Sequence, residues 1–181
     1  PGPKLELPAS DYQGQNFTIL STVHADYDLA PFVAKSFYKH MRNYFTDVEG
    51  LTKEDAEIVL KAKYEPCVID NNQIKDTPAY KFAMRQLERE GTQASEALYH
   101  NLNTLESRAG SQVPFTSINY GTCTLPEGRM VIRALLEGSI KGIGALHKTS
   151  IFPCGIFQLM SGVNKEPGTP NYDLKQLAMR S

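Results

Sequence analysis

The residues with the clearest chemical potential lie in SQVPFTSINYGTCTLPEGR, residues 111–129, where a cysteine follows a strand-like segment and a glycine. Cys123 stands just before a predicted helix start, and the positive end of a helix lowers the pKa of a thiol. A cysteine nucleophile also needs a base within hydrogen-bond reach, and no histidine forms a local motif with it. Because free cysteine is often simply buried, two interpretations stay open. Cys123 is a catalytic thiol served by His147 or His24, or it is a structural residue.

Two polar residues interrupt the apolar strand predicted over residues 112–120. The period of two places Ser117 and Asn119 on one face of this strand, and Thr116, Ile118 and Tyr120 on the other. Buried polar groups need partners, so such residues often face a cavity or a ligand. The alternative is an ordinary solvated face.

The other two cysteines give weaker evidence of a chemical role. Cys154 lies between apolar residues in a predicted strand, which favours a buried structural thiol, and Cys67 receives no role. An odd, sparse set of cysteines without a CxxC pair fits neither a disulfide framework nor a zinc site. It predicts a protein of the reducing cytoplasm.

Composition narrows the function classes. The chain has 181 residues, enough for one domain with a core, and a formal net charge of -1. A net charge this close to zero does not predict binding to nucleic acid or to an anionic membrane. No run of 18 apolar residues predicts a membrane span, and the N-terminus lacks the pattern of a signal peptide.

These residues must be positioned by a predominantly helical α/β chain with a few strands. The predicted helices cover residues 28–45, 52–63, 78–107, 126–141 and 171–181, and the predicted strands cover 112–120 and 150–160. Asp28 is the predicted N-cap of the first helix, with Pro31 in its first turn. Residues 1–23 are predicted to be poorly ordered or atypical. Two strands joined through a helix indicate a parallel crossover.

The longest predicted helix, 78–107, carries an apolar stripe along its whole length. Gly91 and Ala94 at its midpoint would allow a close helix crossing. The stripe fits either a plain core helix or a contact between subunits.

Three longer stretches resemble one protein family. They read HADYDLAPFVAKSFYKH (24–40), HNLNTLESRAGSQVPFTSINYGTCTLPEGRMV (100–131) and TSIFPCGIFQLMSGVNKEPGTPNYDLKQLA (149–178). They are similar to the anaerobic ribonucleoside-triphosphate reductases, the class III or glycyl-radical ribonucleotide reductases. The first 23 residues and the region from about residue 46 to 75 match the family poorly.

The resemblance implies that residues 24–181 form part of a catalytic, ten-stranded α/β barrel made of two five-stranded halves. In that family a glycyl radical generates a thiyl radical on a finger-loop cysteine, which starts the reduction of ribonucleoside triphosphates to deoxyribonucleotides for DNA replication. Formate commonly supplies the electrons, and an iron–sulfur activating enzyme installs the radical. Allosteric nucleotides (ATP, dATP and other dNTPs) bind at the interface of a homodimer. The implied partners are the rest of the reductase chain, a second copy and the activating enzyme.

The sequence also departs from the family pattern. The family's finger-loop motif, glycyl-radical site, early-strand cysteine and ATP-cone find no match, so we expect a truncated central segment that is inactive alone. Neither Cys123 nor Cys154 matches the radical cysteine, and we assign no catalytic and no metal-binding residue. Helix 78–107 becomes a candidate for the dimer face. The candidates for lining the substrate cavity are Ser117, Asn119, Thr122 and Cys123.

Three functions therefore remain to be separated. The first is a segment of an anaerobic reductase. The second is a stand-alone cysteine-dependent enzyme built on Cys123. The third is a noncatalytic nucleotide-binding or assembly piece of a split reductase.

Overall fold

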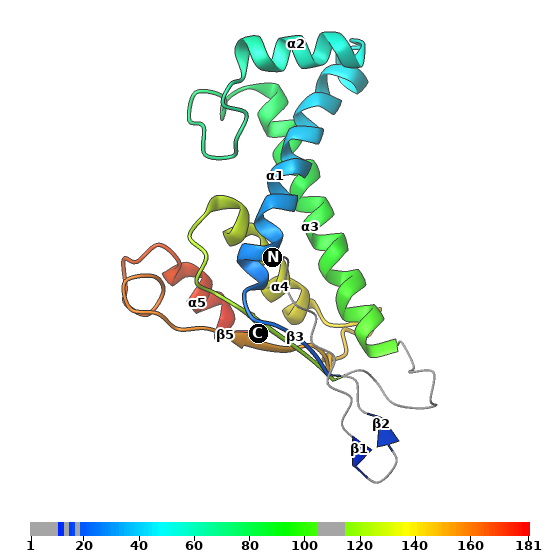
Figure 1. Cartoon of the computed structure of the whole chain (residues 1–181), viewed down its shortest axis with the longest axis vertical. Helices are drawn as coiled ribbons and strands as arrows, with labels where there is room; N and C mark the ends of the chain where they lie inside the picture. The colour runs from blue at the N-terminus through cyan, green and yellow to red at the C-terminus, as the bar shows by residue number, and fades with distance from the viewer. Residues whose placement is uncertain (1–10, 13–14, 17–18, 105–114) are drawn as a thin grey trace.

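A computed structural model of the chain describes residues 11–12, 15–16, 19–104 and 115–181. The chain contains helices α1 to α5, one π-helical segment, η1, and short strands β1 to β5 (Figure 1). The strands are β1 Asp11–Tyr12, β2 Gln15–Asn16, β3 Ile19–Thr22, β4 Phe115–Tyr120 and β5 Cys154–Phe157. The helices are α1 Ala25–Asn43, η1 Tyr44–Val48, α2 Lys53–Lys63, α3 Pro78–Thr104, α4 Pro126–Lys141 and α5 Tyr172–Ala178.

Three parallel strands form the sheet that organises the lower part of the molecule. Their order is β3-β4-β5, so β4 is central, and β1 pairs separately with β2 in an antiparallel ladder. The connection from β4 to β5 runs through α4, which is the predicted parallel crossover. The fold is therefore mixed α/β, with helices that outweigh a few parallel strands.

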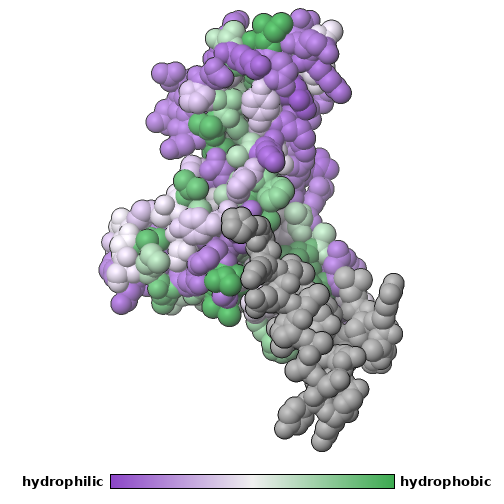
Figure 2. Space-filling model, viewed as in Figure 1, coloured by the Kyte–Doolittle hydropathy of each residue, from purple (hydrophilic) through white to green (hydrophobic). Residues whose placement is uncertain are grey.

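Helices α1 and α3 run side by side along the long axis, and α2 crosses the far end of this pair (Figure 1). Buried apolar side chains form two clusters. One lies in this helical arm and includes Phe37, Met41 and Leu60, and the other joins the sheet to α4 and α5 through Ile118, Ile132 and Leu174. The arm presents mostly hydrophilic surface in the view of Figure 2.

The N-terminal prediction needs correction. Residues 1–23 were predicted to be poorly ordered or atypical, but within them Ile19–Thr22 is an edge strand that pairs in parallel with β4. Four residues give no periodic signal, and only the neighbouring strand supplies their hydrogen bonds. The predicted residues 105–107 of the long helix and 112–114 of the strand lie outside the described part of the chain.

Helix α1 begins earlier than predicted. His24, and not Asp28, is the N-cap, so Pro31 lies inside the helix. Phe37 and Met41 of this helix are fully buried, whereas Phe32 is 63% exposed. The Phe32 ring instead lies under Lys35 Nζ, 5.8 Å from the ring centroid.

The second predicted strand, 150–160, is also wrong at both ends, because β5 covers only Cys154–Phe157. Before the strand, the side chain of Asn103 accepts the backbone N–H groups of Ile151 and Phe152 at 2.9 and 3.1 Å. A side chain therefore takes the donors that a ladder would need.

Beyond the strand, Gln158 still donates its N–H to the carbonyl of Tyr120 at 2.8 Å. The N–H of Met160 then turns to the side-chain oxygen of Asn164, also at 2.8 Å. This change of partner ends the pairing.

The crossing of α3 differs in detail from the prediction. Gly91 does face Ala134 of α4, but Ala94 is exposed, and the neighbouring Ser95 is the residue that is buried there, packed against Gly138. The helix is confirmed, but at this crossing the buried position is Ser95 and not Ala94, a difference of one residue that the sequence alone does not fix.

Candidate functional site

The polar residues of β4 lie on the face of the sheet opposite the helices. Thr116, Ile118 and Tyr120 are buried, whereas Ser117 and Asn119 are half-buried, so the predicted alternation of faces is correct. Figure 1 shows α1, α4 and α5 on the same side of this sheet. The other side therefore presents the side chains of Ser117 and Asn119 beyond the helical layer.

These two polar residues differ in their partners. Ser117 is aligned with Ser21 of β3 and Cys154 of β5, and its hydroxyl donates to Ser21 Oγ at 3.1 Å. The side-chain oxygen of Asn119 is buried without a hydrogen-bond partner among the described residues. A buried acceptor without a donor is costly, so Asn119 is the residue of this face that most needs a ligand.

Directly after β4, the turn Gly121–Cys123 is held by a carboxylate. Asp26 Oδ2 accepts the backbone N–H groups of Gly121, Thr122 and Cys123 at 3.0, 3.1 and 2.9 Å. Asp26 lies in the first turn of α1 and is completely buried. Gly121 has φ of +126°, a conformation that favours glycine, and this lets three successive N–H groups converge on one oxygen.

Two buried asparagines hold the carbonyls of the same turn. Asn164 donates to the carbonyl of Gly121 at 2.8 Å, and Asn171 donates to the carbonyls of Gly121 and Cys123 at 3.1 and 2.9 Å. Arg129 in turn donates to Asn171 Oδ1 at 2.6 Å, which leaves the asparagine amide group to face the turn. Hydrogen bonds therefore hold both the N–H groups and the carbonyl groups of the turn.

Cys123 is a buried thiol in this arrangement. It exposes none of its surface and fits over Gly128 in the first turn of α4. Burial raises the pKa of the Cys123 thiol, and the negative charges of Asp26 and Glu127 add to this, although a hydrogen bond from the Leu125 N–H opposes it. A neutral, enclosed thiol is not the low-pKa thiolate that nucleophilic catalysis requires.

The two histidines proposed as bases are engaged elsewhere. The ring of His24 stands edge-on to Tyr27, with 6.0 Å between ring centroids, and His147 Nδ1 lies 2.8 Å from the carbonyl of Lys141. No described histidine forms a hydrogen bond with Cys123. The geometry does not support a stand-alone cysteine-dependent enzyme.

Thr122 is the last of the cavity candidates, and Cys154 is the thiol that was assigned a structural role. Thr122 is buried, and its carbonyl accepts the hydroxyl of Tyr27 at 3.2 Å. Cys154 was predicted to be a buried thiol, but it is exposed. It is the first residue of an edge strand, so the apolar residues around it in sequence do not enclose it.

Sequence reasoning missed Asp26, Asn164 and Asn171, the three side chains that build the turn. Asp26 is separated from Cys123 by 97 residues along the chain. The only local hint is that an aspartate in a first helical turn favours the helix, which does not reveal where its carboxylate points.

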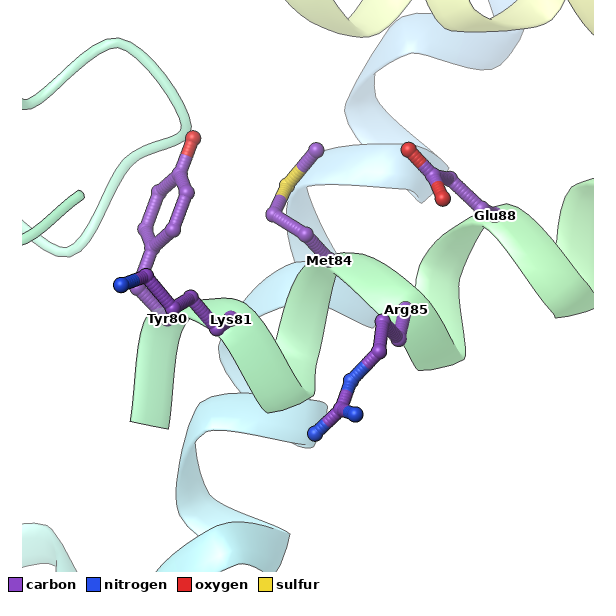
Figure 3. A pocket seen from close by; sticks show the side chains of 5 residues that line it. All are labelled: Tyr80, Lys81, Met84, Arg85 and Glu88. Carbon is purple, nitrogen blue, oxygen red and sulfur yellow. The ribbon is translucent and has the colours of Figure 1, made fainter. Parts of the chain in front are cut away.

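A separate hollow of about 450 Å³ lies along α3 (Figure 3). Tyr80, Met84 and Glu88 project along one side of the helix, and Lys81 and Arg85 complete the lining. Tyr80 donates its hydroxyl to the carbonyl of Ile69 at 2.8 Å, which closes one end.

The described residues contain no cluster of three or more histidine, cysteine, aspartate or glutamate side chains that could hold a metal ion. Among them there is also no helix with the length and apolar character needed to cross a bilayer.

Comparison with known proteins gives a consistent result. A family model described as anaerobic ribonucleoside-triphosphate reductase matches residues 10–181. An anaerobic ribonucleoside-triphosphate reductase of Enterobacteria phage T4 is 33% identical over 96% of this chain and 23% of its own length. The proteins of the same name are 32% identical over 83% of this chain in Salmonella typhimurium, and 37% identical over 59% in Haemophilus influenzae. The chain spans only 17% and 15% of those two relatives.

Proposed function

Because this chain belongs to the anaerobic ribonucleoside-triphosphate reductase family, we propose that it supplies one wall of the substrate cavity of such an enzyme. The whole reductase would convert ribonucleoside triphosphates to deoxyribonucleotides by glycyl- and thiyl-radical chemistry. The parallel strands β3, β4 and β5 would be part of the ten-stranded barrel. The radical-bearing residues would come from the rest of the reductase, and this chain would bind and orient the nucleotide.

One observation carries this proposal: the buried side-chain oxygen of Asn119, on the helix-free face of the central strand, has no hydrogen-bond partner within the part of the chain that the structure describes. In parallel α/β folds, ligands bind outside the carboxyl ends of the strands, and Asn119 is the penultimate residue of β4. A ribose hydroxyl could donate to this oxygen. Ser117 would flank the nucleotide two residues earlier on the same face.

The whole enzyme would also need an electron donor, an activating enzyme and effector nucleotides. Formate would supply the electrons, and the iron–sulfur activating enzyme would install the glycyl radical on another part of the protein. The parent enzyme would be a homodimer tuned by ATP, dATP or other nucleotides. The hollow on α3 would suit an effector phosphate, since the described residues give Lys81 and Arg85 no ion-pair partner.

The test is Asn119→Ala in the activated full-length enzyme. Loss of one neutral hydrogen bond to the substrate should raise KM by about two- to tenfold, from roughly 0.5–1.5 kcal/mol. Asn72→Ala, the same change at an exposed position, is the matched control. Unchanged turnover and substrate affinity in Asn119→Ala would refute this role of Asn119. A wild-type enzyme that reduces no ribonucleoside triphosphate would refute the proposed function itself.

A further inference from the structure

The turn Gly121–Cys123 has no free backbone hydrogen-bonding group. Asp26 takes all three N–H groups, and the three carbonyls accept hydrogen bonds from Asn164, Asn171 and the Tyr27 hydroxyl. These partners come from α1, from the loop after β5 and from the cap of α5. Three separate parts of the chain thus converge on three residues.

The choice of a carboxylate for this task is costly. Asp26 is completely buried, and no described lysine, arginine or histidine forms an ion pair with it. Removing a carboxylate from water is expensive, and the partners that the described residues supply are N–H dipoles, including that of Tyr27 at 3.1 Å from Oδ1. Hydrogen bonds to a charged acceptor are about twice as strong as neutral ones, so they give a stiffer turn.

The stiff turn adjoins the proposed cavity wall. Asn119 is two residues before Gly121, and the strand leaves the sheet at this turn. Only Tyr120 separates Asn119 from this turn, so a shift of the turn would pull on the end of the strand that carries the Asn119 side chain. A displacement of about 1 Å in a positioning element can cost a hundredfold in rate.

We infer that Asp26 is a positioning residue of the substrate site, which fixes the end of β4 so that Asn119 meets the nucleotide. This inference rests on the proposed function, because it assumes that the helix-free face of β4 contacts the substrate. Asp26 itself does not touch the nucleotide, since it lies buried behind the turn.

The experiment compares Asp26→Ala and Asp26→Asn with the wild type in the activated full-length enzyme, with CTP as the substrate. Asp28→Asn is the matched control, because Asp28 lies in the same helical turn and is exposed. For each variant, KM and kcat are measured together with amide hydrogen exchange of residues 121–123. Unfolding of a fraction of the enzyme lowers kcat but leaves KM unchanged, so KM reports positioning.

The expected result is a rise in KM of about tenfold for Asp26→Ala, with exchange of the 121–123 amides at least tenfold faster. Asp26→Asn keeps an acceptor oxygen and should show smaller changes in the same direction, and Asp28→Asn should match the wild type. If Asp26→Ala does not fold, Asp26→Asn carries the test.

Two results would overturn the inference about Asp26 alone. One is fast exchange in the turn with unchanged KM, and the other is unchanged exchange in both Asp26 variants. A wild-type enzyme that does not reduce CTP or any other ribonucleoside triphosphate would overturn the proposed function and this role with it.

Discussion

Replacement of Gly128 by alanine should destabilise the helix that follows the turn. A Cβ atom at position 128 would lie 2.7 Å from the Cβ of Cys123, closer still to its Sγ, and 3.2 Å from the carbonyl oxygen of Asp26. Real Cβ atoms essentially never approach other atoms within 3.0 Å, so something must move. Cys123 cannot move freely, because its N–H is held by Asp26 and its carbonyl by Asn171.

The expected magnitude follows from two opposing terms. Overpacking a well-packed core costs roughly 1–3 kcal/mol, and the fixed position of Cys123 favours the upper end. Glycine to alanine in a helix gains about 1 kcal/mol from helix propensity. The net destabilisation of α4 is therefore about 2 kcal/mol, or roughly thirtyfold faster exchange of its amides.

The control is Gly91→Ala in α3. A Cβ at position 91 would lie 3.7 Å from the Cβ of Ala134, an ordinary van der Waals distance, so only the propensity gain of about 1 kcal/mol applies. Native-state hydrogen exchange of α3 and α4 in the full-length protein measures both variants. If the amides of α4 exchange no faster in the Gly128→Ala variant than in the wild type, the reasoning is refuted. Cys123→Ala combined with Gly128→Ala should recover part of the loss, since it removes the closest atom.

Three further predictions follow from other parts of the chain. In the 181-residue chain, iodoacetamide should alkylate the exposed Cys154 at least tenfold faster than the buried Cys123. Peptide mapping measures both alkylation rates, and equal rates would contradict the burial of Cys123. The Tyr38 hydroxyl donates a hydrogen bond to Glu57 at 2.5 Å, and this bond, aided by burial, raises the pKa of Tyr38 to about 12. The stability that this pair contributes is therefore present below pH 10 and is lost as the pH rises from 10 to about 12. Glu57→Gln should lower the pKa of Tyr38 toward 10 in an ultraviolet titration that uses Tyr38→Phe as the reference, and an unchanged curve would argue against this pair. Thr52→Ala should cost about 1 kcal/mol of α2 stability, because Thr52 Oγ caps the helix, whereas Thr52→Ser should be neutral by hydrogen exchange.

Local chemistry determined the elements whose signals lie within a few residues. The predicted helix 126–141 coincides with α4, because proline is favoured in the first turn of a helix, where Pro126 stands, and Gly142 follows the end of the helix. The alternation of β4 was also readable, since successive side chains of a strand point to opposite faces. The stretches that resemble the reductase family were enough to name the family that the comparisons support.

Tertiary structure alone decided which groups meet. The bonds from Asp26 to the turn join residues 95 to 97 positions apart, and those from Asn164 and Asn171 join residues 43 to 50 apart. No periodicity or short motif encodes such a separation, because a side chain's partner depends on where the whole chain places its backbone. The exposure of Cys154 has the same origin: its apolar neighbours are close in sequence, but burial is set by the elements that pack around a residue in space.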